Sequence, residues 1–156
     1  MYLSFMNKVF YIILIILVAT SCSVKPIDNY HGVAFLEAKQ KKLLVNKSNK
    51  NDVIKILGAP STKSILEDDL WIYIENRKSK SSLFKLGKNI VLTSNVLVLE
   101  IDKKGILTNK KFYNIDDQNK IDFNDDETKM SDKDSFVYGV LSSLKQKVES
   151  TKKNAK

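Results

Sequence analysis

The hydrophobic and polar positions divide the chain into an apolar beginning, a middle with helical and then strand-like periods, and an amphipathic end. Residues 9–19 form an uninterrupted apolar run. The run is too short to span a bilayer comfortably, since a spanning helix needs about 20 residues. A run of this length followed by small residues is typical of a secretory signal peptide. We therefore assign residues 1–21 to a signal peptide and residues 22–32 to a tether.

Helical spacing of apolar residues follows the tether in two segments. A first helix is predicted within residues 33–45, where four apolar residues fall close together: Phe35, Leu36, Leu43 and Leu44. The second helix, predicted over residues 50–57, has clearer ends. Asn49 can cap it, with Asp52 in the place of a capping-box acid. Gly58 and Pro60 then end it, because glycine accepts a positive φ and proline cannot continue a helix.

Residues 61–116 change to the period of strands. Residues 61–67 predict a short lead-in strand, and residues 90–102 predict a long strand or a bulged pair of strands. Residues 102–105 predict a tight turn into a returning strand. Residues 70–75 alternate, with Leu70, Ile72 and Ile74 on one face and three others opposite: Trp71, Tyr73 and Glu75. Helices followed by strands predict an α+β fold. We expect two N-terminal helices on one face of an antiparallel meander of three to four strands, plus a C-terminal helix.

Two aromatic side chains of the alternating strand are candidate contacts for a partner. If the helices cover the other face, Trp71 and Tyr73 are exposed and could anchor an interface. The alternative is that the loop around Leu83 and Phe84 covers the two rings. The sequence leaves both interpretations open.

Residues 116–156 consist of an acidic segment followed by an amphipathic one. Residues 116–134 hold eight acids against three lysines and predict a flexible linker. Residues 135–156 predict an amphipathic helix with a basic tail. Its apolar stripe needs a cover, which could be its own domain, a partner subunit or a membrane surface. The candidate partner-binding residues of this stripe are Phe136, Val140 and Leu144.

The net charge of +8 permits contact with an anionic surface. Four lysines gather in one predicted loop, where they can meet phospholipid head groups or only solvent: Lys78, Lys80, Lys85 and Lys88. The other lysines are scattered along the chain, and the signal peptide points out of the cytoplasm. We therefore expect no nucleic-acid partner.

Catalytic and metal-binding groups are scarce in this sequence. It has one cysteine and one histidine, so neither a disulfide nor a Cys/His metal cluster can form within the chain. The paired acids at 116–117 and 125–126 lack the alternating ligands and central glycine of a calcium loop. No glycine-rich phosphate loop or nucleophile motif is present. We expect neither an enzyme nor a bound metal or cofactor.

The lone cysteine ends a short motif of small residues. Ala19-Thr20-Ser21-Cys22 resembles a bacterial lipobox. The resemblance implies that lipid is attached to the Cys22 thiol and that the signal peptide is cut just before it. Ser23 in place of an aspartate resembles the sorting signal for the outer membrane. The alternative is a buried cysteine near the end of an uncleaved anchor helix.

Residues 31–115 resemble the SmpA/OmlA lipoprotein family, also known as BamE, of the barrel assembly machinery. The resemblance rests on the capped helix ending VIKILGAPS, the strand DLWIYI and the hairpin VLEIDKKGILTNKKFY. It implies a BamE-like domain over residues 33–115, on a lipid-anchored protein at the periplasmic face of the outer membrane. The implied partners are other subunits of the assembly complex and anionic phospholipid. The alternative is a lipoprotein adaptor or inhibitor that binds another periplasmic protein.

Overall fold

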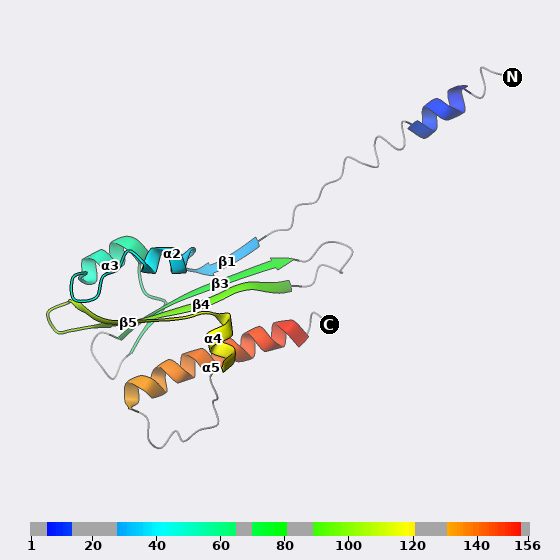
Figure 1. Cartoon of the computed structure of the whole chain (residues 1–156). Coiled ribbons are helices and arrows are strands. Elements are labelled where there is room, and N and C mark those ends of the chain that lie inside the picture. Colours follow the sequence, from blue (N-terminus) through cyan, green and yellow to red (C-terminus); the bar gives the residue numbers. More distant parts are fainter. Residues whose placement is uncertain (1–5, 14–27, 65–69, 81–88, 121–130, 154–156) are drawn as a thin grey trace.

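An antiparallel sheet lies at the centre of the fold, with helices on both of its faces (Figure 1). The computed structural model describes residues 6–13, 28–64, 70–80, 89–120 and 131–153. After a helical segment at 6–13, the elements are β1 (Asp28–Gly32), α2 (Leu36–Gln40), α3 (Lys50–Leu57), β2 (Thr62–Lys63), β3 (Leu70–Lys80), β4 (Asn89–Ile101), β5 (Leu107–Tyr113), α4 (Ile115–Lys120) and α5 (Asp132–Lys153). In the part of the chain that the structure describes, no helix has the length and apolar character needed to cross a membrane.

The sheet has the strand order β1-β3-β4-β5, and β2 also pairs with β3. The α+β class, the antiparallel sheet, the short lead-in strand and the C-terminal helix are confirmed. The number of strands is five, more than the three to four predicted, because residues 28–32 form β1 instead of belonging to the tether. Gly32 makes this pairing possible at the end of β1. Its φ is 81°, and a Cβ there would collide with the carbonyl oxygen of Ile74.

The helix over Lys50–Leu57 has the bounds that the sequence predicts. The side chain of Asn49 accepts hydrogen bonds from the backbone N–H groups of residues 51 and 52. The carboxylate of Asp52 accepts the N–H of Asn49 at 2.9 Å, which completes the capping box. Gly58 follows with a φ of 83°, and Gly105 has the same φ in the predicted tight turn between β4 and β5.

The first helix is shorter than predicted, because a lysine from the sheet ends it. α2 stops at Gln40, whereas the sequence predicted a helix within residues 33–45. The ammonium group of Lys110 on β5 donates hydrogen bonds of 2.9 Å to the carbonyl oxygens of Gln40 and Leu43. The Gln40 carbonyl oxygen also accepts the backbone N–H of Leu43 at 3.1 Å, in the turn that follows the helix. Burial lowers the pKa of Lys110.

The helices α2 and α3 cover the sheet face that carries Trp71 and Tyr73, so the expectation that these rings are exposed is wrong. Trp71 is 4% exposed and Tyr73 is 0% exposed. The Trp71 ring lies under the ammonium group of Lys63, which is 4.5 Å from the ring centroid. The core on this face consists of Leu36, Leu43, Val53, Leu57, Trp71, Tyr73, Leu97, Leu99, Ile101 and Leu107. The alternation predicted for β3 is confirmed. However, α2 and α3 cover the face with Trp71 and Tyr73 instead of the face with Leu70 and Ile72.

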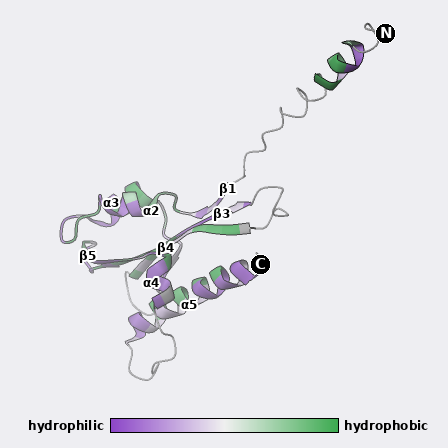
Figure 2. Cartoon of the chain, turned by 45° about the vertical axis from the view of Figure 1, so that its right-hand side comes forward, coloured by the Kyte–Doolittle hydropathy of each residue, from purple (hydrophilic) through white to green (hydrophobic). Residues whose placement is uncertain are grey.

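The C-terminal helix covers the opposite face of the sheet (Figures 1 and 2). Val137 and Leu141 of α5 pack on four strand residues, which are Leu70, Ile72, Val96 and Val98. The three candidate partner-binding residues of the stripe are partly buried against this second core: Phe136, Val140 and Leu144. The sequence left open whether this stripe packs on its own domain, a partner or a membrane. In the structure it packs on the sheet of its own domain. α5 starts at Asp132, so it takes in the end of the predicted linker.

Part of the acidic segment is also helical and docks on the sheet. Residues 115–120 form α4, where the sequence predicted a flexible linker, and residues 121–130 lie outside the described residues. Gln118 is 1% exposed, and its amide nitrogen donates to the carbonyl oxygen of Ser94 at 2.9 Å. The Ser94 hydroxyl donates back to the amide oxygen of Gln118 at 3.3 Å. The pairing of β4 with β5 reaches only to Val96. The Gln118–Ser94 hydrogen bonds therefore join α4 to a part of β4 that β5 does not pair with.

We predict that Leu141→Ala destabilises the whole domain. Leu141 is 1% exposed, and its truncation leaves a cavity between α5 and the sheet, at a cost of about 2–5 kcal/mol. Urea denaturation should show the loss as a lower midpoint. Gln146→Ala, on the exposed side of the same helix, is the control and should change the free energy of unfolding by less than about 0.5 kcal/mol. Equal midpoints for the two variants would contradict the docking of α5.

A second prediction concerns the pH dependence that Tyr73 contributes. Burial raises the pKa of Tyr73 to about 12, and its hydroxyl donates to the carbonyl oxygen of Gly58 at 3.0 Å. In the unfolded chain the phenol ionises near pH 10. Between these values the folded state keeps a proton that the unfolded state has lost, so the stabilisation is complete below pH 10 and decreases as the pH rises to 12.

The measurement compares wild type with Tyr73→Phe, which cannot ionise. At pH 8 the variant should be less stable by about 1 kcal/mol, because it lacks the hydrogen bond to Gly58. Above pH 10 wild type should lose about 1–2 kcal/mol more than the variant, after allowance for screening by solvent. Denaturation curves that stay parallel from pH 8 to 12 would contradict the prediction.

Candidate functional site

Two exposed aromatic side chains lie together where β1 leads into α2. Tyr30 is 43% exposed and Phe35 is 67% exposed, and their ring centroids are 6.4 Å apart. A shallow depression of about 330 Å³ lies beside them. We call this region the Tyr30–Phe35 surface and define it by five residues: Tyr30, Phe35, Glu37, Lys41 and Arg77. It combines exposed apolar area with charges of both signs.

Phe35 has a backbone conformation that is rare for a large side chain. Its φ is 59° and its ψ is 39°, in the left-handed region. Such a residue costs of the order of 1–3 kcal/mol and persists only when its surroundings hold it there. The conformation turns the ring outward, while the next residue, Leu36, is fully buried in the core.

The carboxylate of Glu75 holds this conformation. Its two oxygens accept the backbone N–H groups of Phe35, at 2.7 Å, and Leu36, at 3.2 Å. The side-chain nitrogen of Asn95 donates to the same carboxylate at 2.9 Å. Glu75 is only 6% exposed, so these donors replace the water that it loses on folding. The carboxylate also takes the place of a side-chain cap at the start of α2, where a negative charge is favourable.

An ion pair fixes the other half of the surface. The guanidinium group of Arg77 donates to the carboxylate of Asp28, and these hydrogen bonds hold the pKa of Asp28 below its ordinary value, with help from Ser79. The Arg77 guanidinium carbon lies 5.2 Å from the centroid of the Tyr30 ring. The ring of Tyr30 on β1 therefore lies against Arg77, its pairing partner on β3.

The structure does not bring the residues predicted as sites into one place. Trp71 and Tyr73 belong to the core under α2 and α3, and the candidate residues of α5 pack under the opposite face. Lys78 and Lys80 lie near the end of β3, where they pair with Val91 and Asn89 at the beginning of β4. The remaining predicted site residues lie outside the described residues: Cys22, Lys85 and Lys88.

The Tyr30–Phe35 surface was not predicted from the sequence. Tyr30 was assigned to the tether, and Phe35 was counted with the apolar stripe of the first helix. The available signal was Glu75, which follows Trp71 and Tyr73 at an inward position of β3. A carboxylate at such a position requires donors from a neighbouring segment, because burying it unpaired is costly.

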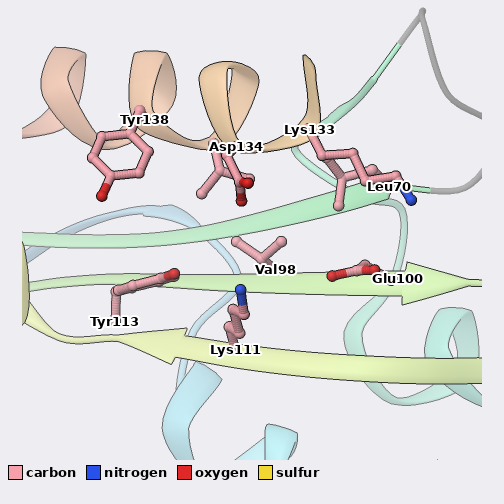
Figure 3. A pocket seen from close by; sticks show the side chains of 9 residues that line it. Leu70, Val98, Glu100, Lys111, Tyr113, Lys133, Asp134 and Tyr138 are labelled. Atoms are coloured by element: carbon pink, nitrogen blue, oxygen red, sulfur yellow. The ribbon is translucent and has the colours of Figure 1, made fainter. Parts of the chain in front are cut away.

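A second depression lies between α5 and the sheet (Figure 3). Four charged residues line it, two acids and two lysines: Glu100, Asp134, Lys111 and Lys133. Their charges balance, so the depression has no net preference for an anion or a cation. The Glu100 carboxylate already accepts the side-chain N–H of Asn109 at 2.8 Å. Tyr113 also lines it, and burial raises the pKa of that phenol. This depression offers fewer recognition features than the Tyr30–Phe35 surface.

The described residues combine few histidine and metal-ligating groups with exposed aromatic side chains. His31 lies on the exposed edge strand β1 and is the only histidine of the chain. Among the described residues, no three side chains of histidine, cysteine, aspartate or glutamate are grouped to hold a metal ion. Exposed aromatic rings with a neighbouring arginine are instead typical of protein interfaces.

We predict that Glu75→Gln destabilises the domain and releases Phe35. The amide group of glutamine would face the donors of Leu36 or Asn95, leaving a buried mismatch that costs about 1–3 kcal/mol. Urea denaturation measures the loss, and the amide chemical shift of residue 35 reports the backbone change. Glu37→Gln is the matched control, because the Glu37–Lys41 ion pair is exposed. A Glu75→Gln variant as stable as this control would show that the carboxylate does not hold α2.

Comparison with known proteins identifies the family. The model of the outer membrane protein assembly factor BamE domain matches residues 34–111, which is half of the chain. No curated protein and no solved structure matches the chain. The matched range contains Phe35, Glu75 and Arg77 with the elements from α2 to β4, and it leaves α4 and α5 outside. The chain belongs to the family of BamE domains of outer membrane protein assembly factors.

Proposed function

We propose that the protein is a non-catalytic accessory lipoprotein of the β-barrel assembly machinery, which supports the folding and insertion of outer-membrane β-barrel proteins. It acts by binding another subunit of the complex through the Tyr30–Phe35 surface. The observation that carries this proposal is Phe35, which is held exposed in a left-handed conformation by the buried carboxylate of Glu75.

The energetic cost of this arrangement supports a functional role. A left-handed phenylalanine is strained, and its exposed ring gains little from burial in the free protein. A glycine at this position would avoid the strain. The strained ring gains its full apolar contact only when a partner covers it. Aromatic residues and arginine dominate the binding energy of many interfaces, and Tyr30 and Arg77 flank Phe35 here.

The anchor and the location complete the proposal. A lipid on the Cys22 thiol would hold the mature chain on the periplasmic face of the outer membrane, since several acyl chains make attachment persistent. Lys78 and Lys80, with Lys85 and Lys88 from the undescribed loop, would meet anionic phospholipid. The covalent lipid is the only cofactor in this proposal, and no nucleic acid takes part.

Co-purification of Phe35→Gly tests the assembly role. Glycine adopts a positive φ without strain, so thermal unfolding should show a variant at least as stable as wild type, by up to about 1 kcal/mol. The recovery of barrel-assembly subunits with the tagged full chain should fall about tenfold or more, as expected for an interface anchor. Ile54→Ser is the control, because Ile54 is an exposed apolar residue on α3, away from the surface.

Two results would contradict the proposal. Unchanged recovery of assembly subunits with Phe35→Gly would remove the Tyr30–Phe35 surface from the interface. Recovery of a single periplasmic protein in place of these subunits, by wild type, would favour the adaptor or inhibitor function instead.

A further inference from the structure

β1 is an edge strand of the sheet, and one of its sides is open. The strand order β1-β3-β4-β5 places it at the margin, where β3 is its pairing partner (Figure 1). Residues 29–32 are exposed, and Asp28 is partly buried. An edge strand presents unpaired N–H and C=O groups to which another chain can pair. β1 therefore offers a template for an added strand.

The register identifies the peptide groups that face outward. Val33, directly after β1, donates its N–H to the carbonyl oxygen of Ile74 on β3 at 2.9 Å. Residues that exchange hydrogen bonds with a neighbouring antiparallel strand alternate with residues that do not, and the β1–β3 register has no shift. The odd-numbered residues of β1 therefore bond to β3. The backbone N–H and C=O groups of Asp28, Tyr30 and Gly32 consequently point away from the sheet.

The opposite edge of the sheet is protected, whereas β1 is not. At the start of β5, Leu107 donates its N–H to the carbonyl oxygen of Ser48 at 2.9 Å and accepts the N–H of Asn46 at 2.8 Å. Further along, the side chain of Asn109 accepts the N–H of Lys110 at 2.8 Å. Within the described part of the chain, no comparable hydrogen bond reaches the outward groups of β1. β1 is therefore the edge that is available for pairing.

The side chains along this edge define the segment that fits it. The Tyr30 ring lies against Arg77, its pairing partner, and 6.4 Å from the ring of Phe35. A residue paired with Tyr30 would place its side chain beside these rings, where an apolar side chain gains contact. The residues before and after it would lie on the opposite face, beside the polar and exposed Asn29 and His31. The edge thus fits an extended segment in which apolar and polar residues alternate.

We propose that an extended segment of the assembly subunit that covers Phe35 adds a strand to β1, by pairing with the outward groups of Asp28, Tyr30 and Gly32. Its main-chain hydrogen bonds supply affinity, and its apolar residue beside Tyr30 supplies specificity. The added strand is continuous with the Tyr30–Phe35 surface, because Tyr30 belongs to both. This inference rests on the proposed function, and it adds the structural class of the element by which the partner binds.

Residue-resolved amide hydrogen exchange tests the pairing. The measurement compares the free full chain with its complex with co-purified barrel-assembly subunits. In the free protein the amides of Asn29 and His31, which bond to β3, should exchange more slowly than those of Tyr30 and Gly32. In the complex the amides of Tyr30 and Gly32 should slow by about tenfold or more, because they gain acceptors. The amides of α5, on the other face of the sheet, are the internal control and should keep their rates.

Two variants at residue 30 separate the backbone contribution from that of the ring. Tyr30→Val removes the ring and retains the outward N–H, whereas Tyr30→Pro also removes that N–H. Neither variant removes a hydrogen bond between β1 and β3, so thermal unfolding should show similar midpoints. Recovery of assembly subunits should be about fivefold to tenfold lower with Tyr30→Pro than with Tyr30→Val, as expected for the loss of one hydrogen bond. Equal recovery by the two variants would count against strand addition.

The exchange experiment distinguishes the ways in which the inference can fail. If the outward amides exchange as fast in the complex as in the free protein, strand addition is wrong and the assembly role remains. Slowing that appears in the free protein as its concentration rises would assign this edge to a second copy and overturn the inference. If wild type recovers no assembly subunits at all, the proposed function fails and this inference fails with it.

Discussion

The buried carboxylate of Glu75 is the interaction on which the exposed part of this fold depends. It lies at an inward position of β3, where the pattern otherwise calls for an apolar residue. Its donors come from two elements, because β4 supplies Asn95 and the start of α2 supplies the N–H groups of Phe35 and Leu36. One carboxylate therefore caps a helix, sets a strained backbone and joins that helix to the sheet. A buried charge is acceptable only with such complete pairing.

The sheet also sets a second requirement, since both of its faces are apolar. β3 and β4 carry hydrophobic residues on both faces of the sheet. A layer of helices on one face alone would leave the apolar residues of the other face in water. α2 and α3 cover the Trp71 face and α5 covers the Leu70 face. The matched family region ends at residue 111, so this chain buries the second face with a helix from outside that region. α5 is in this sense part of the core and not an appendage.

Local signals were enough to predict some elements and not others. The bounds of α3, the turn at Gly105 and the alternation of β3 depend on residues close in sequence, so the sequence predicted them. The two faces of β3 were assigned to the wrong helices because both faces are apolar, so the alternation alone does not indicate which face α2 and α3 cover. α2 was predicted too long because its end is set by Lys110, about seventy residues away. β1 was missed because its residues are mostly polar and exposed, and its pairing depends on Gly32 and the Asp28–Arg77 ion pair.

The candidate site was missed for the same reason, since Phe35 has its conformation only through Glu75. β1 connects the Tyr30–Phe35 surface to the proposed lipid anchor at Cys22. Tyr30 lies on the same short strand whose first residue, Asp28, continues into the tether. Tyr30 pairs with Arg77, two residues from the Asp28–Ser79 pair, which is about 7 Å along the strand. A lipid at Cys22 would thus hold the aromatic surface near the bilayer. A partner that binds there must present its own site close to the membrane surface, as an integral or anchored subunit does. With a lipid on Cys22, this arrangement would suit the membrane-bound subunits of the proposed assembly role.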